Sequence, residues 1–270
     1  MNQEILDRLR MDDRFPHILC PGCGIGSAMN AMIRAIAESG LTNDDICIIS
    51  GIGCSSRVPG YIDADTFHTL HGRAIPSATG VKLAHPDKEM IIIAGDGDLL
   101  AIGGNHFIHA ARRNLDMTVI LINNHNYGMT GGQYSPTTPQ GKRAKTAPYG
   151  CVERAFDACE MGIGSGAVFV ARSTTYHTPH LKGLIKQAMK KNGFALVEVI
   201  SQCPTLYGRL NRMGDAVKML EYFKENSITV SQVKEPKDAE GKIVIGVLHD
   251  IEAPEYYESY RKVCEHAQRR

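Results

Sequence analysis

Apolar residues along the chain recur in two patterns that alternate between about residues 24 and 200. In one, apolar positions repeat every three or four residues, which is typical of a helix with one buried face. In the other, four to seven apolar residues follow one another, which is typical of strands buried on both faces. We therefore expect helices at 24–38, 73–84, 104–113, 152–160 and 180–191, and strands at 46–50, 90–94, 117–122, 167–171 and 194–200.

This alternation predicts an α/β fold, in which a parallel sheet carries helices on both faces. A polar segment rich in Gly and Pro interrupts the pattern at 123–148. Structureless segments of that length are uncommon in compact domains and are usually functional. Residues 204–270 are more charged and less periodic. We therefore predict one domain over residues 1–203 and a C-terminal extension over residues 204–270.

Composition and charge disfavour several classes of protein, namely nucleic-acid-binding, membrane and secreted proteins. The 270 residues are 43% hydrophobic and carry a formal net charge of +1, with no long run of one sign. This disfavours nucleic acid as a partner. No apolar run reaches the length of a membrane span, and the first residues lack the apolar core of a secretory signal. We expect a soluble, cytoplasmic protein that contacts neither a membrane nor a nucleic acid.

The eight cysteines do not indicate a disulfide framework in a chain of this kind. Four of them lie beside Gly or Pro in turn-like sequence and are candidates for a functional role: Cys20, Cys23, Cys54 and Cys203. The others lie in apolar or amphipathic stretches and are expected to be inert: Cys47, Cys151, Cys159 and Cys264.

The pair Cys20 and Cys23 stands at the entry to a predicted helix, which suits a redox dithiol, half a zinc site or half an iron–sulfur site. Cys54 and Cys203 each follow a predicted strand. The carboxyl ends of parallel strands line one crevice, so all four thiols could converge there. No strand precedes Cys20, which disfavours a thioredoxin-like dithiol. The spacing favours a cluster over zinc or unrelated thiols, and both alternatives stay open.

A second motif, Gly95-Asp96-Gly97, ends a buried strand, and Asn124 follows the end of the next. A diphosphate is strongly hydrated, and a hard divalent cation with oxygen ligands would bridge it to the protein. Asp96 and Asn124 could supply two of these ligands and the Asn126 carbonyl a third. The glycines would let the backbone approach the phosphates. Taken alone, the tripeptide could also be a simple turn.

Five motifs follow one another along the chain. They are Cys-Pro-Gly-Cys-Gly, Gly-Ile-Gly-Cys-Ser-Ser-Arg, His-Thr-Leu-His-Gly-Arg-Ala, Gly-Asp-Gly-Asp and Asn-Asn-x-x-Tyr-Gly-Met-Thr-Gly-Gly-Gln. In this order they resemble the β subunits of 2-oxoacid:ferredoxin oxidoreductases, and the resemblance covers about residues 14–210.

The resemblance implies thiamine pyrophosphate, Mg²⁺ and one four-iron four-sulfur cluster as cofactors. Its implied site residues come from the same motifs. They are Cys20, Cys23, Cys54 and Cys203 for the cluster, Asp96, Asn124 and Asn126 for Mg²⁺, Gly95, Gly97, Asp98, Thr130 and Gly131 for the cofactor, and His71 beside its reactive end. The whole segment Thr130 to Gln133 would wrap the diphosphate, whereas His68 is expected to be structural and His71 could instead be a polar group at a helix start.

The resemblance also implies an incomplete active site. The chain has no room for a second thiamine-binding domain, so a partner α subunit should supply the activating glutamate and much of the coenzyme A site. The reaction would be oxidative decarboxylation of a 2-oxoacid with CoA, or its reverse, with ferredoxin exchanging electrons. A cluster-free thiamine decarboxylase or synthase subunit would leave the four thiols idle. A non-enzymatic metal scaffold would leave the polar segment without a purpose.

Arg57 indicates which 2-oxoacid is used, because it lies three residues after Cys54. A guanidinium there could bind a distal carboxylate in a bidentate manner. Such a carboxylate is present in 2-oxoglutarate and absent from pyruvate. Met129 could help to set the size of the pocket. We therefore predict 2-oxoglutarate over pyruvate or a broad range of acids, although Arg57 could instead pair with a structural acid or the cluster.

Overall fold

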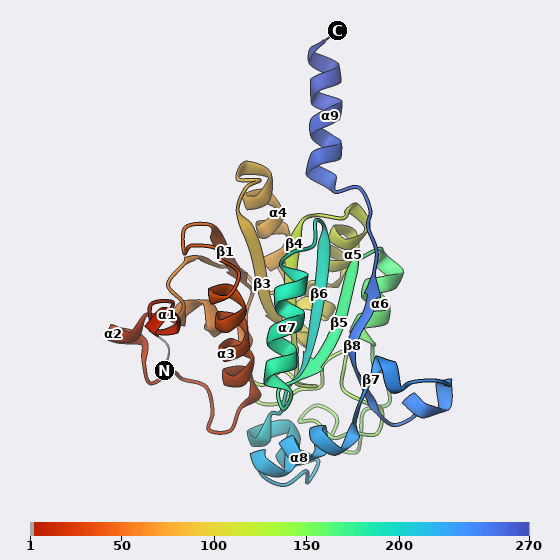
Figure 1. Ribbon diagram of the computed structural model, residues 1–270. Coiled ribbons are helices and arrows are strands. Elements are labelled where there is room, and N and C mark those ends of the chain that lie inside the picture. Colours follow the sequence, from red (N-terminus) through yellow and green to blue (C-terminus); the bar gives the residue numbers. More distant parts are fainter. Residues whose placement is uncertain (1–2, 270) are drawn as a thin grey trace.

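The computed structural model describes residues 3–269, apart from the side chains of residues 12 and 13, and is built around one sheet (Figure 1). The strand order is β2-β1-β3-β4-β6-β5-β8-β7. The pairs from β2 to β5 are all parallel, β8 runs antiparallel to β5, and β7 runs parallel to β8. The strands are β1 (Ile46–Ser50), β2 (Asp65–His68), β3 (Glu89–Gly95), β4 (Met117–Asn123), β5 (Phe169–Thr174), β6 (Phe194–Ile200), β7 (Ser227–Thr229) and β8 (Ile243–Asp250).

Helices cover both faces of this sheet. α3 and α7 pack on one face, and α4, α5 and α6 pack on the other, each group with its own hydrophobic core. The α/β fold with a parallel sheet is thereby confirmed. The helices are α1 (Gln3–Leu6), α2 (Met11–Arg14), α3 (Gly24–Ala37), α4 (Ala74–Ala84), α5 (Gly104–Arg113), α6 (Ala158–Ser165), α7 (Thr178–Ala188), α8 (Ala216–Asn226) and α9 (Tyr256–Gln268).

The central strand β3 shows why its sequence is continuously apolar. Successive side chains of a strand point to opposite faces of the sheet. Ile91 and Ile93 accordingly lie in the core under α3, whereas Ile92 and Ala94 lie in the core under α4 and α5. Both faces are buried, so neither set can be polar. The carboxyl end of the strand is thereby fixed at the edge where Asp96 follows it.

Most of the predicted elements have bounds within a residue or two of the observed ones. The prediction of a helix at 152–160 is wrong. The backbone of that segment is used elsewhere: Cys151 N–H donates to the Lys142 carbonyl, and Phe156 N–H donates to the Pro136 carbonyl. The helix α6 begins only after Asp157, whose carboxylate caps it. The strand expected at 167–171 is shifted and runs as β5.

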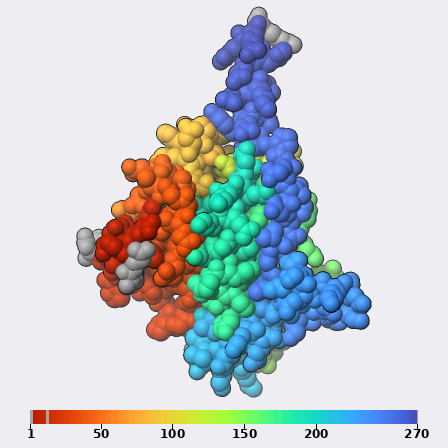
Figure 2. Space-filling view, viewed as in Figure 1, coloured from red at the N-terminus to blue at the C-terminus, as the bar shows by residue number. Residues whose placement is uncertain are grey.

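The sequence analysis also missed the edge strand β2, whose residues are mostly exposed and carry no apolar run. Residues 204–270 contribute α8, β7, β8 and α9, and β8 extends the main sheet beyond β5. α9 stands clear of the rest of the molecule (Figure 2). Within residues 3–269, no helix is both long and apolar enough to cross a membrane. The domain boundary at residue 203 stays a prediction.

Candidate active site

Two neighbouring strands deliver polar side chains to the same edge of the sheet. Gly95, the last residue of β3, pairs in register with Ile122 of β4. Asp96 therefore emerges beside Asn123 and Asn124, as expected where parallel strands end together. Asp96, Asn124 and Asn126 line one cavity of about 90 Å³. The structure thus brings together the three residues predicted to hold Mg²⁺.

Asp96 is a buried carboxylate, only 2% exposed. Ser135 and Thr137 each place a hydroxyl 2.6 Å from its Oδ2 atom, so the carboxylate has a fixed orientation. Burial raises the pKa of Asp96, although these two hydroxyls partly offset the effect. No Lys or Arg among the described residues forms an ion pair with it. A bound cation would compensate for this buried negative charge.

Asn126 adds an oxygen that lacks a partner. Its Nδ2 donates to the Asn124 carbonyl at 2.9 Å, while its Oδ1 is buried without a hydrogen bond. A buried amide oxygen left unpaired is costly unless a ligand satisfies it. The free oxygen belongs to the side chain, whereas the sequence analysis named the backbone carbonyl. Together with Asp96 and Asn124, it gives the oxygen-only donor set that Mg²⁺ prefers, so these residues fit that ion.

His71 also lines this cavity, and Asp98 orients it. The Nδ1 atom of His71 contacts Asp98 Oδ1, which also accepts hydrogen bonds from the backbone N–H groups of Gly72 at 2.7 Å and Ile52 at 3.2 Å. The ring of Tyr127 stands edge-on to His71, with 6.1 Å between the ring centroids. Asp98 therefore holds two loops and the imidazole together, leaving Nε2 of His71 for a ligand.

The four predicted cysteines, Cys20, Cys23, Cys54 and Cys203, line a second cavity of about 330 Å³. The first two come from the turn before α3, and the other two follow β1 and β6. A backbone hydrogen bond of 3.1 Å from Gly24 to the Gln202 carbonyl joins the two ends of this arrangement. No disulfide forms among them.

The surroundings of these thiols suit a metal centre. Burial, together with the nearby sulfurs of Cys203, Cys54 and Cys20, raises the pKa of Cys23 to about 12. Burial raises the pKa of Cys54 as well. Thiolates this crowded need a cationic partner, which iron or zinc supplies. The arrangement therefore fits a tetrathiolate centre, either a cubane cluster or zinc.

The two cavities lie against each other. Both are lined by Cys54, Asn124, Gly128 and Met129. A Cβ atom on Gly128 would lie 3.4 Å from Cys54 Sγ and 3.8 Å from Asn126 Oδ1. Gly128 therefore lies between the Cys54 sulfur and the Asn126 amide oxygen. Groups bound in the two cavities would be close neighbours.

The remaining predicted residues also border these cavities. Arg57 lines the thiol cavity, and within the described chain its guanidinium forms no hydrogen bond or ion pair with another side chain. The structural acid considered as its alternative partner is thus not found among those residues. Thr130 lines the smaller cavity and donates to Gln133 Oε1 at 2.8 Å, and Gly131 has a φ of 114° that favours glycine.

Sequence reasoning missed Ser135 and Thr137, the two residues that hold Asp96. They belong to the polar segment at 123–148, where hydroxyl residues are common and have no diagnostic spacing. Tyr127 belongs to the Asn-Asn-x-x-Tyr motif, and its hydroxyl donates to the Gly97 carbonyl at 3.2 Å, a contact that the motif alone does not predict. The unusual length of the polar segment at 123–148 is the sequence feature that indicates a role for these residues, and in the structure this segment folds back over the end of β3.

Comparison with known proteins identifies the family. Residues 51–199 match the family described as thiamine pyrophosphate enzyme, C-terminal TPP binding domain. The 2-oxoglutarate synthase subunit KorB of Methanocaldococcus jannaschii is 54% identical, over 94% of each chain. The 2-oxoacid:ferredoxin oxidoreductase subunit beta of a Sulfolobus species is 47% identical, over 71% of this chain and 63% of its own. This chain belongs to the family of 2-oxoacid:ferredoxin oxidoreductase β subunits.

A solved structure agrees with this assignment. The chain superposes with a TM-score of 0.88 and 34% identity on a 2-oxoglutarate:ferredoxin oxidoreductase from Magnetococcus marinus, whose structure holds 2-oxoglutarate, coenzyme A and succinyl-CoA. The match covers 98% of this chain and 90% of that one. The resemblance drawn from the sequence motifs is thereby confirmed, and the chain is a subunit of an oxidoreductase that binds thiamine pyrophosphate.

Proposed function

We propose that this β subunit, with its α subunit, oxidatively decarboxylates 2-oxoglutarate with CoA to succinyl-CoA and CO₂, or runs the reverse reaction. Electrons would pass through one [4Fe–4S] cluster to or from ferredoxin. The observation that carries the proposal is the shared wall between the two cavities, formed by Cys54, Asn124, Gly128 and Met129. This shared wall would place the thiamine pyrophosphate, where the 2-oxoacid reacts, next to the cluster that accepts the electrons.

In the smaller cavity, Asp96, Asn124 and Asn126 would hold Mg²⁺, which bridges the diphosphate of the cofactor. The turn from Thr130 to Gln133 would wrap the phosphates, and Gly95 and Gly97 would allow a close backbone approach. Thiamine pyrophosphate supplies the carbon nucleophile that 2-oxoacid decarboxylation requires. The protein's own work is to bind it, fix its orientation and keep His71 at its reactive end.

In the thiol cavity, Cys20, Cys23, Cys54 and Cys203 would be the four ligands of the cluster. Four thiolates also suit zinc, but zinc has no redox chemistry, and the family's reaction needs an electron acceptor. When bound, a [4Fe–4S] cluster accepts one electron at a time. Cys20 is exposed, so this side of the cavity would face ferredoxin.

Arg57 would recognise the substrate. Arg57 lines the thiol cavity together with Met129, which also borders the smaller cavity, and its guanidinium has no side-chain partner among the described residues. A distal carboxylate of the 2-oxoacid would satisfy it through a charge-assisted pair. This favours 2-oxoglutarate over pyruvate. The α subunit would complete the site with a glutamate and the CoA pocket, and a cytoplasmic location stays a prediction.

The test is an assay of the αβ assembly, purified without oxygen, on a panel of 2-oxoacids with CoA and a low-potential acceptor. We expect about four irons and one thiamine pyrophosphate per β chain, as the proposed cofactors require. 2-Oxoglutarate should be the fastest substrate. Faster turnover of pyruvate would instead support a pyruvate or broad-range enzyme. Zinc or no metal in the assembly would support a cluster-free thiamine enzyme.

A further inference from the structure

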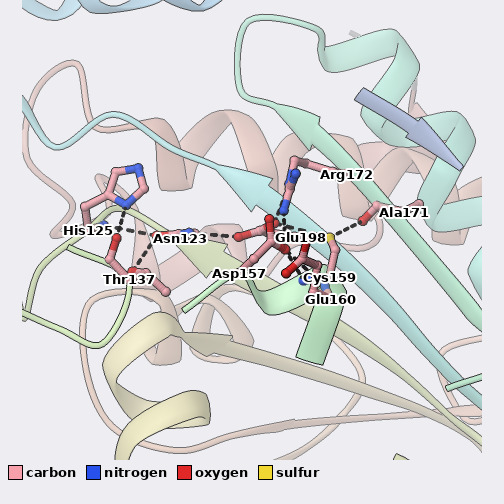
Figure 3. A network of polar contacts seen from close by, with 9 residues as sticks. All are labelled: Asn123, His125, Thr137, Asp157, Cys159, Glu160, Ala171, Arg172 and Glu198. Atoms are coloured by element: carbon pink, nitrogen blue, oxygen red, sulfur yellow. Dashed lines mark hydrogen bonds and ion pairs between the residues drawn. The ribbon is translucent and has the colours of Figure 1, made fainter. Parts of the chain in front are cut away.

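A network of buried polar contacts runs from Arg172 in β5 to Thr137 (Figure 3), and the Thr137 hydroxyl also contacts Asp96, a predicted magnesium ligand. The Nε atom of Arg172 lies 2.6 Å from Glu198 Oε2. The other oxygen of Glu198 accepts a hydrogen bond of 2.8 Å from Asn123 Nδ2. The Oγ1 atom of Thr137 lies 2.8 Å from Asn123 Oδ1 and 2.6 Å from Asp96 Oδ2. The network thus ends on the carboxylate of Asp96.

Regular strands position the first residues of this contact network. Arg172 in β5 and Glu198 in β6 are partners in the register of the two strands, and Asn123 is the last residue of β4. The side chain of Glu198 is only 2% exposed. Asp157, the cap of α6, accepts a second hydrogen bond of 2.6 Å from Arg172 Nη2.

Such a pair is not explained by stability alone. A buried ion pair often contributes no more than well-packed apolar residues would, because desolvation offsets the attraction. Burial works against the charge of Arg172, yet the carboxylate of Glu198 raises the pKa of the guanidinium. The network also borders a cavity of about 670 Å³, so it is not enclosed core on every side. The pair of Arg172 and Glu198 is connected to Asp96 through polar contacts, which suggests that the pair has a role at the predicted magnesium site.

The contact between Thr137 and Asp96 depends on a single hydroxyl hydrogen. Thr137 has one hydroxyl hydrogen, which lies within reach of two acceptors, Asp96 Oδ2 and Asn123 Oδ1. Asn123 is held in turn by Glu198 and by the backbone N–H of His125, at 3.2 Å. Moving Asn123 would therefore displace the Thr137 hydroxyl, which is one of the two hydroxyls that orient Asp96.

We propose that Arg172, Glu198 and Asn123 are positioning residues for the magnesium–diphosphate centre, acting through Thr137 on the carboxylate of Asp96. This inference rests on the proposed function of that cavity. It assigns a role to three residues that do not line the cavity. Partners that orient metal ligands in this way typically change metal affinity when they are removed.

The experiment measures metal affinity rather than turnover. Mn²⁺ replaces Mg²⁺, and the electron paramagnetic resonance signal of free Mn²⁺ is titrated with the αβ assembly and thiamine pyrophosphate. We expect Asn123→Ala and Glu198→Gln to weaken Mn²⁺ binding by about ten- to a hundred-fold. Asn123→Ala leaves the Arg172–Glu198 pair in place, so it remains informative if the Glu198 variant does not fold.

The control removes a comparable ion pair at the opposite end of the sheet. Lys82 Nζ lies 2.6 Å from Asp116 Oδ2, just before β4 begins, and Lys82 is buried. Asp116→Asn should lower the thermal stability and leave Mn²⁺ binding unchanged. Equal weakening in this control would show a general structural effect and overturn the inference.

A double substitution tests the route through Thr137. In a Thr137→Val background, Asn123→Ala should weaken Mn²⁺ binding by no more than about two-fold further, because coupled residues are not additive. Effects that multiply, or single variants that bind Mn²⁺ as the wild type does, would contradict the inference alone. A wild-type assembly that binds no Mn²⁺ with the cofactor would contradict the proposed function as well.

Discussion

At the scale of single residues, Arg57 offers the sharpest test of substrate choice. We expect Arg57→Met to lower kcat/KM for 2-oxoglutarate by about ten- to a hundred-fold, because a charge-assisted hydrogen bond contributes about 1.5–3 kcal/mol. The value for pyruvate should hardly change. Steady-state kinetics of both acids measures the ratio. Arg261→Met is the matched control, since Arg261 lies on the projecting helix α9. Equal losses for both acids would exclude a role in recognition.

Gly97 tests the close approach of the loop to the end of β3. A Cβ atom there would lie 2.2 Å from the Tyr127 ring, so Gly97→Ala must displace Tyr127 and the loop that carries it. Misplacement on the order of 1 Å in a catalytic site costs about a hundred-fold in rate, and we expect that loss in kcat. Gly80→Ala in α4 is the control, since nothing lies within 4 Å of its added carbon. Unchanged kcat in Gly97→Ala would contradict this role of the glycine.

At the scale of elements, β3 begins with a carboxyl group whose pKa is raised. Glu89 begins the strand, and its Oε1 accepts a hydrogen bond of 3.0 Å from the Thr118 hydroxyl. Burial and the nearby Asp116 raise the pKa of Glu89 from 4.5 to about 7. The folded protein therefore keeps a proton there that the unfolded chain releases at lower pH. Its stabilising contribution is complete below about pH 4.5 and is lost as the pH rises through about 7.

This linkage gives a prediction for stability against pH. The Glu89→Gln variant should lack that loss, so raising the pH from 5.5 to 8 should destabilise the wild type more than the variant. The difference should be about 2 kcal/mol, because about 1.5 pH units separate pH 5.5 from the folded pKa of about 7, at about 1.4 kcal/mol for each unit. Thermal unfolding of the assembled enzyme at the two pH values measures it. Parallel changes in both proteins would show that Glu89 does not titrate in this range.

Elements differ in how far the sequence predicts them. The strands at 46–50 and 194–200 were predicted with their observed bounds, because burial on both faces requires an unbroken apolar run. The segment near residue 152 looks helical, but its backbone bonds to the loop at 136–142, which no local pattern reveals. β2 is short and exposed and therefore carries no such run.

The same distinction applies to the site. Cys54, Asp96 and Asn124 could be predicted because each follows a strand, and strand ends meet at one edge of a parallel sheet. The contact of Thr137 with Asp96 depends on how a long loop folds back, so the sequence does not reveal it. Glu198 did carry a signal that was not used: it is the only charged residue in the apolar strand β6, and buried charges are paired or functional.

At the scale of the whole molecule, we propose that this chain holds only part of an active site. The isolated β subunit should bind iron and show no 2-oxoacid oxidation, because the activating glutamate and the CoA pocket are expected on the α subunit. Adding separately purified α subunit should restore turnover of 2-oxoglutarate with CoA. Activity measured before and after mixing tests this division. Substantial turnover by the β subunit alone would contradict it.

The central claim is that the thiol cavity holds a cluster close enough to the thiamine site to exchange electrons with it. The most direct measurement is low-temperature electron paramagnetic resonance of the oxygen-free αβ assembly after mixing with 2-oxoglutarate and CoA. The wild type should develop the signal of a reduced [4Fe–4S] cluster, and Asp96→Asn should keep its iron but give no such signal. A wild-type assembly without this signal, or an Asp96→Asn variant that gives it at full intensity, would contradict the claim.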